Sequence, residues 1–227
     1  MVIPSNTLFT VQQQINAGAK QYGRAENSIQ LLAVSKTQSA DTIEAAFKAG
    51  QTAFGENYLQ EARDKQAALT HLAIEWHFIG PIQSNKTREI AENFSWVHSV
   101  DRLKIATRLS QQRPTHLPPL NICLQVNIDD EASKSGVALQ DLEQLTRAIS
   151  QLPNVQLRGL MAIPKKTTDI TQQRSAFATL RHARDQLLPI TPLDTLSMGM
   201  SNDMEAAIAE GSTIVRVGSA IFGARKT

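Results

Sequence analysis

The stretch QLLAVSKTQSADTIEAAFKAGQTAFG, residues 30–55, sets the pattern of the whole chain. Its first residues, Gln30 to Ser35, form a short apolar run with the length of a buried strand, and Thr52 to Gly55 form a second. Between them, Asp41 to Ala49 repeats apolar residues every three or four positions, which is typical of an amphipathic helix. Strands joined in this way pair in parallel, because parallel neighbours need a long, right-handed crossover. Residues 30–55 are therefore predicted to form a strand–helix–strand unit.

The same alternation continues along the chain and gives eight strand-like runs. They are Gln30–Ser35, Thr52–Gly55, Trp76–Gly80, Trp96–Val100, Ile122–Ile128, Leu157–Ile163, Thr195–Met198 and Thr213–Phe222. Further helices are predicted at Tyr58–Ala68, Leu103–Leu109, Leu139–Leu152 and Ser175–Leu188. Eight such units in a chain near ~250 residues favour a closed (β/α)₈ TIM barrel of the α/β class. An open, doubly wound sheet is the alternative.

A further amphipathic helix is predicted over residues 7–22, before the first strand. Only five residues follow Phe222, too few for an eighth covering helix. We therefore expect the extra N-terminal helix to occupy that position in the outer ring. The 227 residues correspond to about one and a half times the usual ~150 per domain, which favours a single domain spanning residues 1–227.

The composition is that of an ordinary globular protein, with 41% hydrophobic and 19% charged residues. Lysine and arginine number 23 and aspartate and glutamate 21, without a run of like charges, so nucleic acid is not expected as a partner. We expect no secretory signal and no membrane span. Cys123 is the only cysteine, so an internal disulfide is ruled out; we interpret it as an inert buried thiol in a cytoplasmic protein.

Lys36 follows the first predicted strand at the carboxyl end, where barrels of this kind carry their active sites. It has the same side-chain parity as Leu32 and Val34, so inward-facing parity would place its amine at the barrel mouth. Desolvation or a neighbouring cation there favours the neutral amine, which can attack a carbonyl and form a Schiff base. The position alone also fits an exposed lysine that ends a strand.

The last two predicted strands end in groups suited to an anion. Ser201 is placed to cap the predicted helix Met204–Glu210, where free backbone N–H groups attract phosphate. Gly218 permits close backbone approach, and Ser219 adds a hydroxyl, although a plain helix cap is the alternative to a phosphate site. Arg216 lies between two valines and keeps its charge on burial, so it needs a carboxylate, a phosphate or a ring nitrogen as partner. A structural ion pair is the alternative for this arginine.

Seven separated blocks of the sequence carry a resemblance to a known family. They are LAVSKT (32–37), FGENY (54–58), WHFIGPIQSNK (76–86), SKSG (133–136), LRGLM (157–161), SMGMSNDM (197–204) and VRVGSAIFG (215–223). These blocks resemble the signatures of the pyridoxal phosphate homeostasis proteins (YggS/PROSC type), over about residues 8–225. The resemblance implies a single barrel of the alanine racemase N-terminal kind, fold type III, that binds pyridoxal 5′-phosphate (PLP).

The resemblance also implies roles for particular residues. Lys36 would form the Schiff base with PLP, Asn57 would lie beside the cofactor ring, and Arg216 would face the pyridine nitrogen. The remaining cofactor-binding residues that it implies are Ser201, Gly218 and Ser219 at the phosphate, and His77 and Met198 lining the site.

An arginine at the pyridine nitrogen would not supply the proton that makes the ring a strong electron sink. Racemases that resemble this barrel complete their site with a tyrosine from an additional β-domain, for which we expect no room here, and neither Tyr22 nor Tyr58 is an obvious second base. We therefore expect no catalytic residues and no enzyme. The expected function is storage, buffering or delivery of PLP in vitamin B6 and amino-acid homeostasis, by a monomer that passes PLP to apo-enzymes.

Two other functions are weighed against this one. The first is a PLP-dependent amino-acid racemase-like enzyme with weak or unknown activity. The second is aldolase-like chemistry on a phosphorylated sugar, with Lys165 or Lys166 as the amine, although these two lysines are more typical of an exposed loop. Lys134 is a candidate second amine near the rim, against the simpler interpretation of a solvated loop lysine.

The five histidines lack the spacing of a metal site, and no metal is expected. His77 and His98 would meet inside the barrel if both face inward, although histidines satisfied within a core are the more common case.

Overall fold

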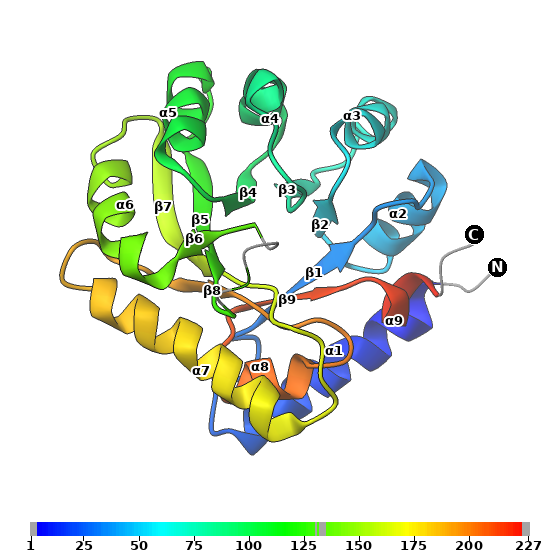
Figure 1. Ribbon diagram of the computed structural model, residues 1–227. Helices are drawn as coiled ribbons and strands as arrows, with labels where there is room; N and C mark the ends of the chain where they lie inside the picture. Colours follow the sequence, from blue (N-terminus) through cyan, green and yellow to red (C-terminus); the bar gives the residue numbers. More distant parts are fainter. Residues whose placement is uncertain (1–3, 130, 132–134, 224–227) are drawn as a thin grey trace.

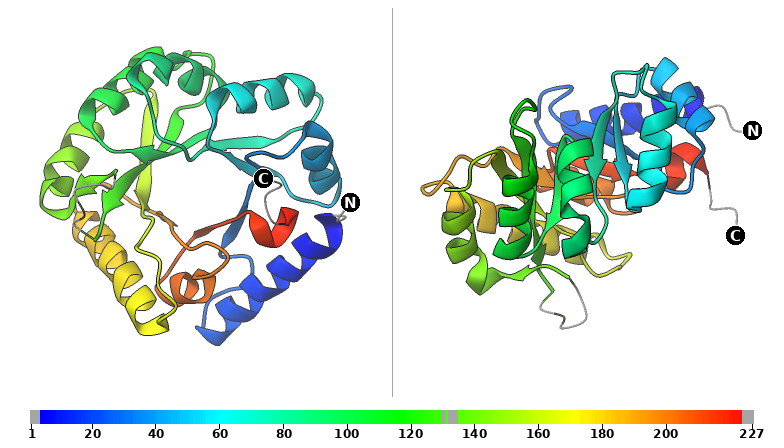
Figure 2. Two further views of the ribbon diagram at one scale, coloured as in Figure 1. Left: turned by 45° about the vertical axis from the view of Figure 1, so that its right-hand side comes forward. Right: turned by 90° about the horizontal axis from the view of Figure 1, so that it is seen from above.

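The computed structural model describes residues 4–129, 131 and 135–223. Within these residues, eight parallel strands close into a barrel and helices surround it (Figures 1 and 2). Pairing of β4 with β5 closes the barrel, and β1 pairs with both β2 and β9. The strands of the barrel are β1 (Gln30–Val34), β2 (Ala53–Glu56), β3 (Glu75–Phe78), β4 (Trp96–Val100), β5 (Leu120–Asn127), β7 (Val155–Met161), β8 (Thr195–Ser197) and β9 (Ile214–Val217). The prediction of a closed barrel is confirmed, and the open sheet is wrong.

The helices form the outer layer and bury their apolar faces against the strands. Ser39 caps the helix that begins at Ala40, because its side chain accepts a hydrogen bond from the Thr42 N–H. Asp169 caps the helix that begins at Ile170, and its side chain accepts from the N–H groups of Thr171 and Gln172. The helices are α1 (Pro4–Gln21), α2 (Ala40–Lys48), α3 (Leu59–Ala68), α4 (Thr87–Asn93), α5 (Leu103–Gln112), α6 (Leu142–Ile149), α7 (Ile170–Leu187), α8 (Met204–Ala209) and α9 (Ser219–Phe222). Smaller elements are the 3₁₀ turns Ser84–Lys86 and Leu139–Asp141, and β6 (Val137–Ala138), which pairs with β5.

Helix α1 takes the place of the eighth covering helix. It packs against α2, α8 and α9, and it lies beside α9 in both views of Figures 1 and 2. The Thr7 hydroxyl donates to the carbonyl of Ile221 at 2.7 Å, and Val11, Ile15 and Ala19 are buried. The predicted position of the N-terminal helix is therefore confirmed.

Several boundaries differ from the prediction, and one helix was not predicted. The last strand ends at Val217 instead of continuing to Phe222, because Gly218 leaves the extended conformation (φ −118°, ψ −71°) and residues 219–222 turn into α9. Helix α4 had no counterpart among the predicted helices; it is short, with seven residues, and buries only Thr87, Ile90 and Ala91. Short helices of this kind give a weak periodic signal, and tertiary packing decides them.

Alternating residues of the strands face the barrel interior. The strand register places Val34 beside Gly55, Gly55 beside His77, and His77 beside Trp96 on this inner side. Two small apolar groups are separate from the main core between strands and helices: Leu32, Ala53 and Ile214, and Trp96, Cys123 and Met161. The interior also buries polar side chains, among them His77, His98, Ser197 and Arg216.

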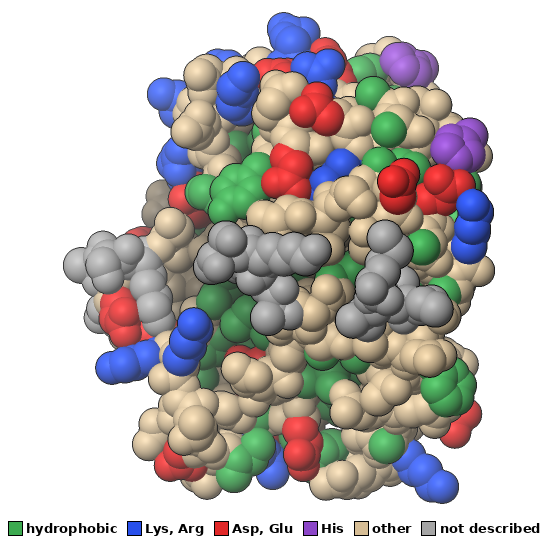
Figure 3. Space-filling model, turned by 90° about the vertical axis from the view of Figure 1, so that its right-hand side faces the viewer, with side chains coloured by type: hydrophobic (Ala, Val, Ile, Leu, Met, Phe, Trp, Pro, Cys, Tyr) green, Lys and Arg blue, Asp and Glu red, His purple; other side chains and the backbone are tan. Residues whose placement is uncertain are grey.

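The surface carries charges of both signs. On the side that α2 and α9 share, lysine, arginine, aspartate and glutamate are interspersed (Figure 3). No helix within the described residues has the length and apolar character that a bilayer span requires.

Candidate functional site

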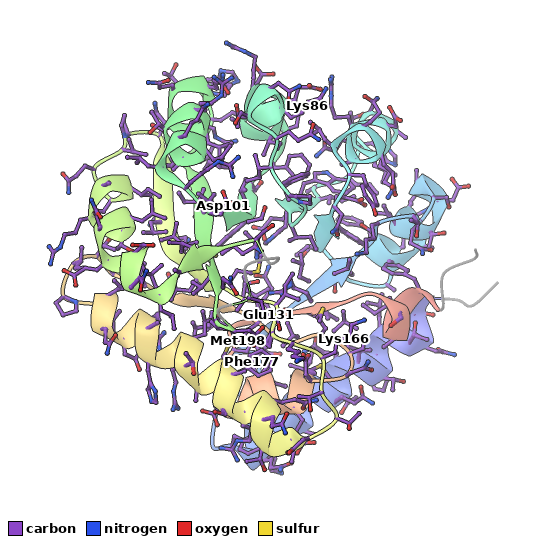
Figure 4. The ribbon with its side chains drawn as sticks, viewed as in Figure 1. Lys86, Asp101, Glu131, Lys166, Phe177 and Met198 are labelled. Atoms are coloured by element: carbon purple, nitrogen blue, oxygen red, sulfur yellow. The ribbon has the colours of Figure 1, made fainter. Side chains whose placement is uncertain are left out.

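A cavity of about 1190 Å³ opens at the carboxyl ends of the strands. Six of the eight cofactor-binding residues predicted from the sequence line it: Lys36, Asn57, Ser201, Arg216, Gly218 and Ser219. They come from segments up to 183 positions apart in the chain, brought together by the pairing of β1 with β2 and β9. We call this cavity the mouth. Further lining comes from residues 163–170 and from Phe177 of α7; Figure 4 labels Lys166 and Phe177 on this side of the barrel.

The other predicted residues are elsewhere. His77 is fully buried inside the barrel and is not among the residues that line the mouth. Met198 is fully buried within the main apolar core, also away from the lining. Lys134 lies outside the described residues. Lys165 and Lys166, the candidates for aldolase-like chemistry, do line the mouth.

Lys36 stands in the loop between β1 and α2, between buried Ser35 and exposed Thr37. The Ser35 N–H donates to the carbonyl of Gly55 at 3.0 Å, which continues the strand pairing by one residue. Thr37 has φ +67°, a left-handed conformation that costs a β-branched residue about 1–3 kcal/mol. Its N–H donates to Glu61 Oε1 at 2.5 Å. The backbone on both sides of Lys36 is thus fixed by hydrogen bonds.

A buried ion pair between Lys65 and Glu56 holds the loop that carries Lys36, because Lys65 also binds the Ser35 carbonyl. Lys65 on α3 donates through Nζ to Glu56 Oε1 and to the Ser35 carbonyl, both at 2.8 Å, and also contacts Glu61. The Ser35 hydroxyl donates to the same Glu56 oxygen at 2.6 Å. Burial raises the pKa of Glu56, and the Lys65 cation opposes this shift. We call Ser35, Glu56, Glu61 and Lys65 the loop anchor.

The loop anchor was not predicted from the sequence, although the position of Lys65 carries a signal. It lies three positions after buried Ala62 and four before buried Leu69, on the apolar face of the predicted helix. A lysine at such a position needs a carboxylate partner, and Glu56 at the end of a buried strand and Glu61 one helical turn earlier are acidic candidates in that unit.

Asn57 brings an unsatisfied group to the mouth. Its side-chain oxygen Oδ1 is buried and has no hydrogen-bond partner among the described residues. Gly80 lies against it so closely that a Cβ at position 80 would be 2.0 Å from the Asn57 carbonyl oxygen. Gly80 is itself held by the Ser99 hydroxyl, which donates to its carbonyl at 2.5 Å. A buried acceptor without a partner is costly, so this position is suited to a ligand that donates or brings water.

The loops after β8 and β9 meet at the opposite side of the mouth. Ser201 does not cap α8 as predicted: the helix begins at Met204, as expected, but Asp203 occupies the N-cap position. The Asp203 carboxylate accepts from the Met200 N–H at 2.6 Å, which forms a tight turn and leaves Ser201 on the lining. Burial raises the pKa of Asp203, while the nearby Arg216 lowers it.

Ser219 completes this side of the mouth at the start of α9. Neither its hydroxyl nor that of Ser201 donates or accepts a hydrogen bond within the described residues. A Cβ at Gly218 would be 3.2 Å from the Val34 carbonyl oxygen, so a side chain there would press on β1. Four basic side chains, Lys36, Lys165, Lys166 and Arg216, line the mouth against two acidic ones, Asp203 and Glu205. This excess of positive charge suits an anion.

Arg216 projects from β9 into the barrel, and its guanidinium is held by oxygen atoms. Nη1 donates to the Ser197 carbonyl at 2.5 Å and to the Ser197 hydroxyl at 2.8 Å, and Nη2 donates to the Ala162 carbonyl at 3.0 Å. No carboxylate of the described chain lies within ion-pair distance, so the predicted structural ion pair is not what holds it. Burial lowers the pKa of Arg216 to about 10, and Asp203 opposes the shift. The guanidinium therefore stays charged near neutral pH.

Known proteins resemble this chain in sequence and in fold. The sequence profile of the family described as "Alanine racemase, N-terminal domain" matches residues 13–226. A relative named "Pyridoxal phosphate homeostasis protein" from Pseudomonas aeruginosa is 61% identical over 222 residues, which are 97% of this chain and 95% of the relative. The relative of the same name from Escherichia coli K12 is 52% identical over 225 residues, 97% of this chain and 96% of the relative.

Solved structures agree. PipY of Synechococcus elongatus PCC7942, with PLP bound, superimposes with a TM-score of 0.81 at 40% identity and covers 92% of this chain and 100% of its own. Alanine racemase from Corynebacterium glutamicum superimposes with a TM-score of 0.72 at 16% identity, over 96% of this chain and 62% of the racemase. The second similarity is one of fold.

Proposed function

This chain belongs to the family of pyridoxal phosphate homeostasis proteins, built on the alanine racemase N-terminal barrel, and from that membership we propose that it binds PLP at the mouth. The proposed role is to hold PLP for storage, buffering or delivery in vitamin B6 and amino-acid homeostasis. The observation that supports this most is the convergence of Lys36, Asn57, Ser201, Arg216, Gly218 and Ser219 on one positively charged cavity.

The residues of the mouth match the chemical groups of PLP. When bound, PLP supplies an aldehyde whose carbon forms a C=N bond with a lysine amine, and the aldehyde oxygen leaves as water. Lys36 is the proposed amine, because the loop anchor fixes the backbone on both sides of it. The hydroxyls of Ser201 and Ser219 are proposed donors to the phosphate, and Gly218 leaves room for it to approach the backbone.

Asn57 and Arg216 are proposed to contact the ring. The buried Asn57 Oδ1 without a partner is the observation that favours an occupant beside it. Arg216 would place a donor at the pyridine nitrogen, and two carbonyls and a hydroxyl of the barrel already orient its guanidinium. His77 and Met198, which the resemblance also implies, are proposed only as supporting residues, since the mouth is not lined by them.

We propose that the protein is not an enzyme. Arg216 remains charged and donates without giving up its proton, so the ring would gain little power as an electron sink. Neither tyrosine lines the mouth: Tyr58 is exposed, and the Tyr22 hydroxyl donates to Glu205 at 3.2 Å. The racemase neighbour supports only a shared fold, and amino-acid racemase-like activity is the alternative that the assay below tests.

The remaining proposals concern the cellular setting. We propose a single-domain monomer in the cytoplasm that exchanges PLP with apo-enzymes. Interspersed surface charges and an open mouth are compatible with such exchange.

The test is spectroscopic. Purified protein is loaded with PLP, and its near-visible absorption band is compared with that of Lys36→Ala and of a Lys165→Ala/Lys166→Ala double variant. We expect Lys36→Ala to lose the band while it unfolds cooperatively at a similar temperature, and the double variant to keep it. After borohydride reduction, the labelled peptide should contain Lys36.

Two results would overturn the proposal. An unchanged band in Lys36→Ala, or a label on Lys165 or Lys166, would place the covalent link elsewhere. Interconversion of L- and D-alanine by the loaded protein at 1–10³ turnovers per second, roughly the usual range of enzymes, would make it a racemase.

A further inference from the structure

A continuous chain of hydrogen bonds crosses the barrel interior beneath Arg216. Glu75 Oε1 is 2.7 Å from His77 Nε2, His77 Nδ1 is 2.8 Å from His98 Nε2, and His98 Nδ1 is 2.7 Å from Ser197 Oγ. Ser197 Oγ is in turn 2.8 Å from Arg216 Nη1. We call these five residues the barrel relay. It runs from β3 and β4 to β8 and β9.

The relay joins the two ends of the barrel. Glu75 is the first residue of β3, and its side chain is 41% exposed at the amino end. Arg216 lines the mouth at the carboxyl end. His77, His98 and Ser197 between them are all fully buried. The two histidines do meet, which the sequence analysis gave as the less favoured possibility, and both have hydrogen-bond partners within the interior, which it favoured.

The chemistry of the two ends fixes the direction of every hydrogen bond. Arginine only donates, so the Ser197 hydroxyl accepts from Arg216 and gives its own hydrogen to His98 Nδ1. An ionised carboxylate only accepts, so His77 donates from Nε2 to Glu75. His77 Nδ1 then has no hydrogen and accepts from His98 Nε2. With both histidines neutral, each therefore carries its hydrogen on Nε2.

The protonation states support this assignment. The hydrogen bond from His77 lowers the pKa of Glu75, which keeps it ionised. Burial lowers the pKa of His77, although the neighbouring Glu75 carboxylate opposes the shift. Burial also lowers the pKa of His98 well below the usual value, and His77 and Arg216 add to that shift. A proton added to the interior would therefore be disfavoured near neutral pH.

Other groups around the relay are arranged to hold it. Trp96 stacks on His77 with centroids 5.5 Å apart and an interplanar angle of 2°, and the Arg158 guanidinium lies 5.1 Å from the Trp96 centroid. Gln30 donates to the Glu75 carboxylate at 3.1 Å. Such packing fixes the ring orientations on which a one-way hydrogen-bond chain depends.

We propose that Glu75, His77, His98 and Ser197 are positioning residues that orient the Arg216 guanidinium for the cofactor ring and couple it to a carboxylate at the opposite end of the barrel. This inference rests on the proposed function, since it assumes that Arg216 contacts the ring. The physical reason is that Arg216 is a buried cation without a carboxylate partner of its own, and the relay connects it to one.

The first test needs no cofactor. Nitrogen-15 NMR of the cofactor-free protein reports which ring nitrogen of each histidine carries hydrogen. We expect His77 and His98 both to be neutral with hydrogen on Nε2 at pH 7, and both N–H signals to be protected from exchange. A neutral ring with hydrogen on Nδ1, or a charged ring, at either position would overturn the relay whether or not PLP binds.

The second test measures how fast PLP leaves the loaded protein, and its absorption maximum. Ser197→Ala removes the hydroxyl next to Arg216, and we expect PLP release about tenfold faster with a shifted maximum. Ser197→Thr keeps a hydroxyl and should restore both. Glu75→Gln keeps an acceptor for His77 but removes the charge, and it should change release at least twofold. Its matched control is Glu26→Gln, an exposed carboxylate before β1 that should behave as wild type.

The outcomes separate two failures. If wild-type protein binds PLP through Lys36 but Ser197→Ala and Glu75→Gln both release it at the wild-type rate with an unshifted maximum, the relay has no positioning role. If Ser197→Ala is poorly folded, Glu75→Gln alone decides. If the NMR result is as expected but wild-type protein binds no PLP, the proposed function fails and the positioning role fails with it, while the hydrogen-bond chain itself stands.

Discussion

Replacing Lys65 by methionine should remove the cation of the loop anchor and leave Glu56 buried without it. The two side chains are 6% and 0% exposed, and their contact distance is 2.8 Å. Methionine fills a similar volume, so the main loss is electrostatic. Breaking a buried pair from one side costs about 3–5 kcal/mol. With a urea m-value of about 2–3 kcal/mol/M, the unfolding midpoint at pH 8 should fall by about 1–2.5 M.

The loss should depend on pH in a defined direction. Burial already raises the pKa of Glu56 in the folded protein, and without Lys65 it rises further. A carboxyl whose folded pKa exceeds its unfolded pKa favours folding at low pH and loses that contribution as pH rises through the folded value. The deficit of Lys65→Met relative to wild type should therefore shrink between pH 8 and pH 5.

Urea titrations followed by circular dichroism at the two pH values provide the assay. Lys48→Met is the control, because Lys48 is 70% exposed and its partner Glu44 is only half-buried, so its midpoint should stay at the wild-type value. Adding Glu56→Gln to Lys65→Met should recover much of the loss. A Lys65→Met midpoint equal to that of wild type at pH 8, or a deficit that is the same at both pH values, would refute the reasoning.

Two further perturbations test the mouth and the interior. Gly80→Ala should lower both the melting temperature and the PLP occupancy, because the new Cβ would meet the Asn57 carbonyl oxygen at 2.0 Å. The control is Gly18→Ala, whose Cβ would face only the end of the Ile208 side chain at 3.1 Å, and it should keep wild-type occupancy in the same absorption assay. Cys123 should resist a thiol-specific chromogenic reagent at pH 8, because burial raises the pKa of its thiol to about 12. The unfolded protein in guanidinium should react fully. Rapid reaction of the folded protein would contradict the buried placement of Cys123.

Much of this architecture can be predicted from the sequence because every strand of the barrel must be short and largely apolar to be buried between the helices and the interior. Each is a short apolar run between helical segments, so all eight were found and their mutual pairing followed from the need for crossovers. Lys36 and Asn57 were also placed at strand ends, and Arg216, Gly218 and Ser219 on the last predicted strand; the barrel gathers all five in one cavity.

The interior resisted prediction because its partners are far apart in the chain. His98 and Ser197 are 99 positions apart, and nothing near either residue indicates that they share a hydrogen bond. Ser201 illustrates a second limit: it was predicted as the N-cap, but Asp203 takes that position, and its carboxylate accepts from the Met200 N–H. To predict the loop anchor from the sequence, the apolar face of the helix that carries Lys65 would have to be matched with Glu56 at the end of a strand. Neither the helix pattern nor the strand pattern alone indicates this contact.

The seam between β1 and β9 determines when this fold can be completed. Gln30 pairs with Ile214, and Thr7 reaches Ile221, so the earliest segments acquire their neighbours only after more than 180 further residues have been made. On a ribosome, the nascent β1 would expose one unpaired edge for most of synthesis. Synthesis of β9, rather than growth of the first half of the chain, is then the step that the barrel needs before it can close, and the mouth forms with it.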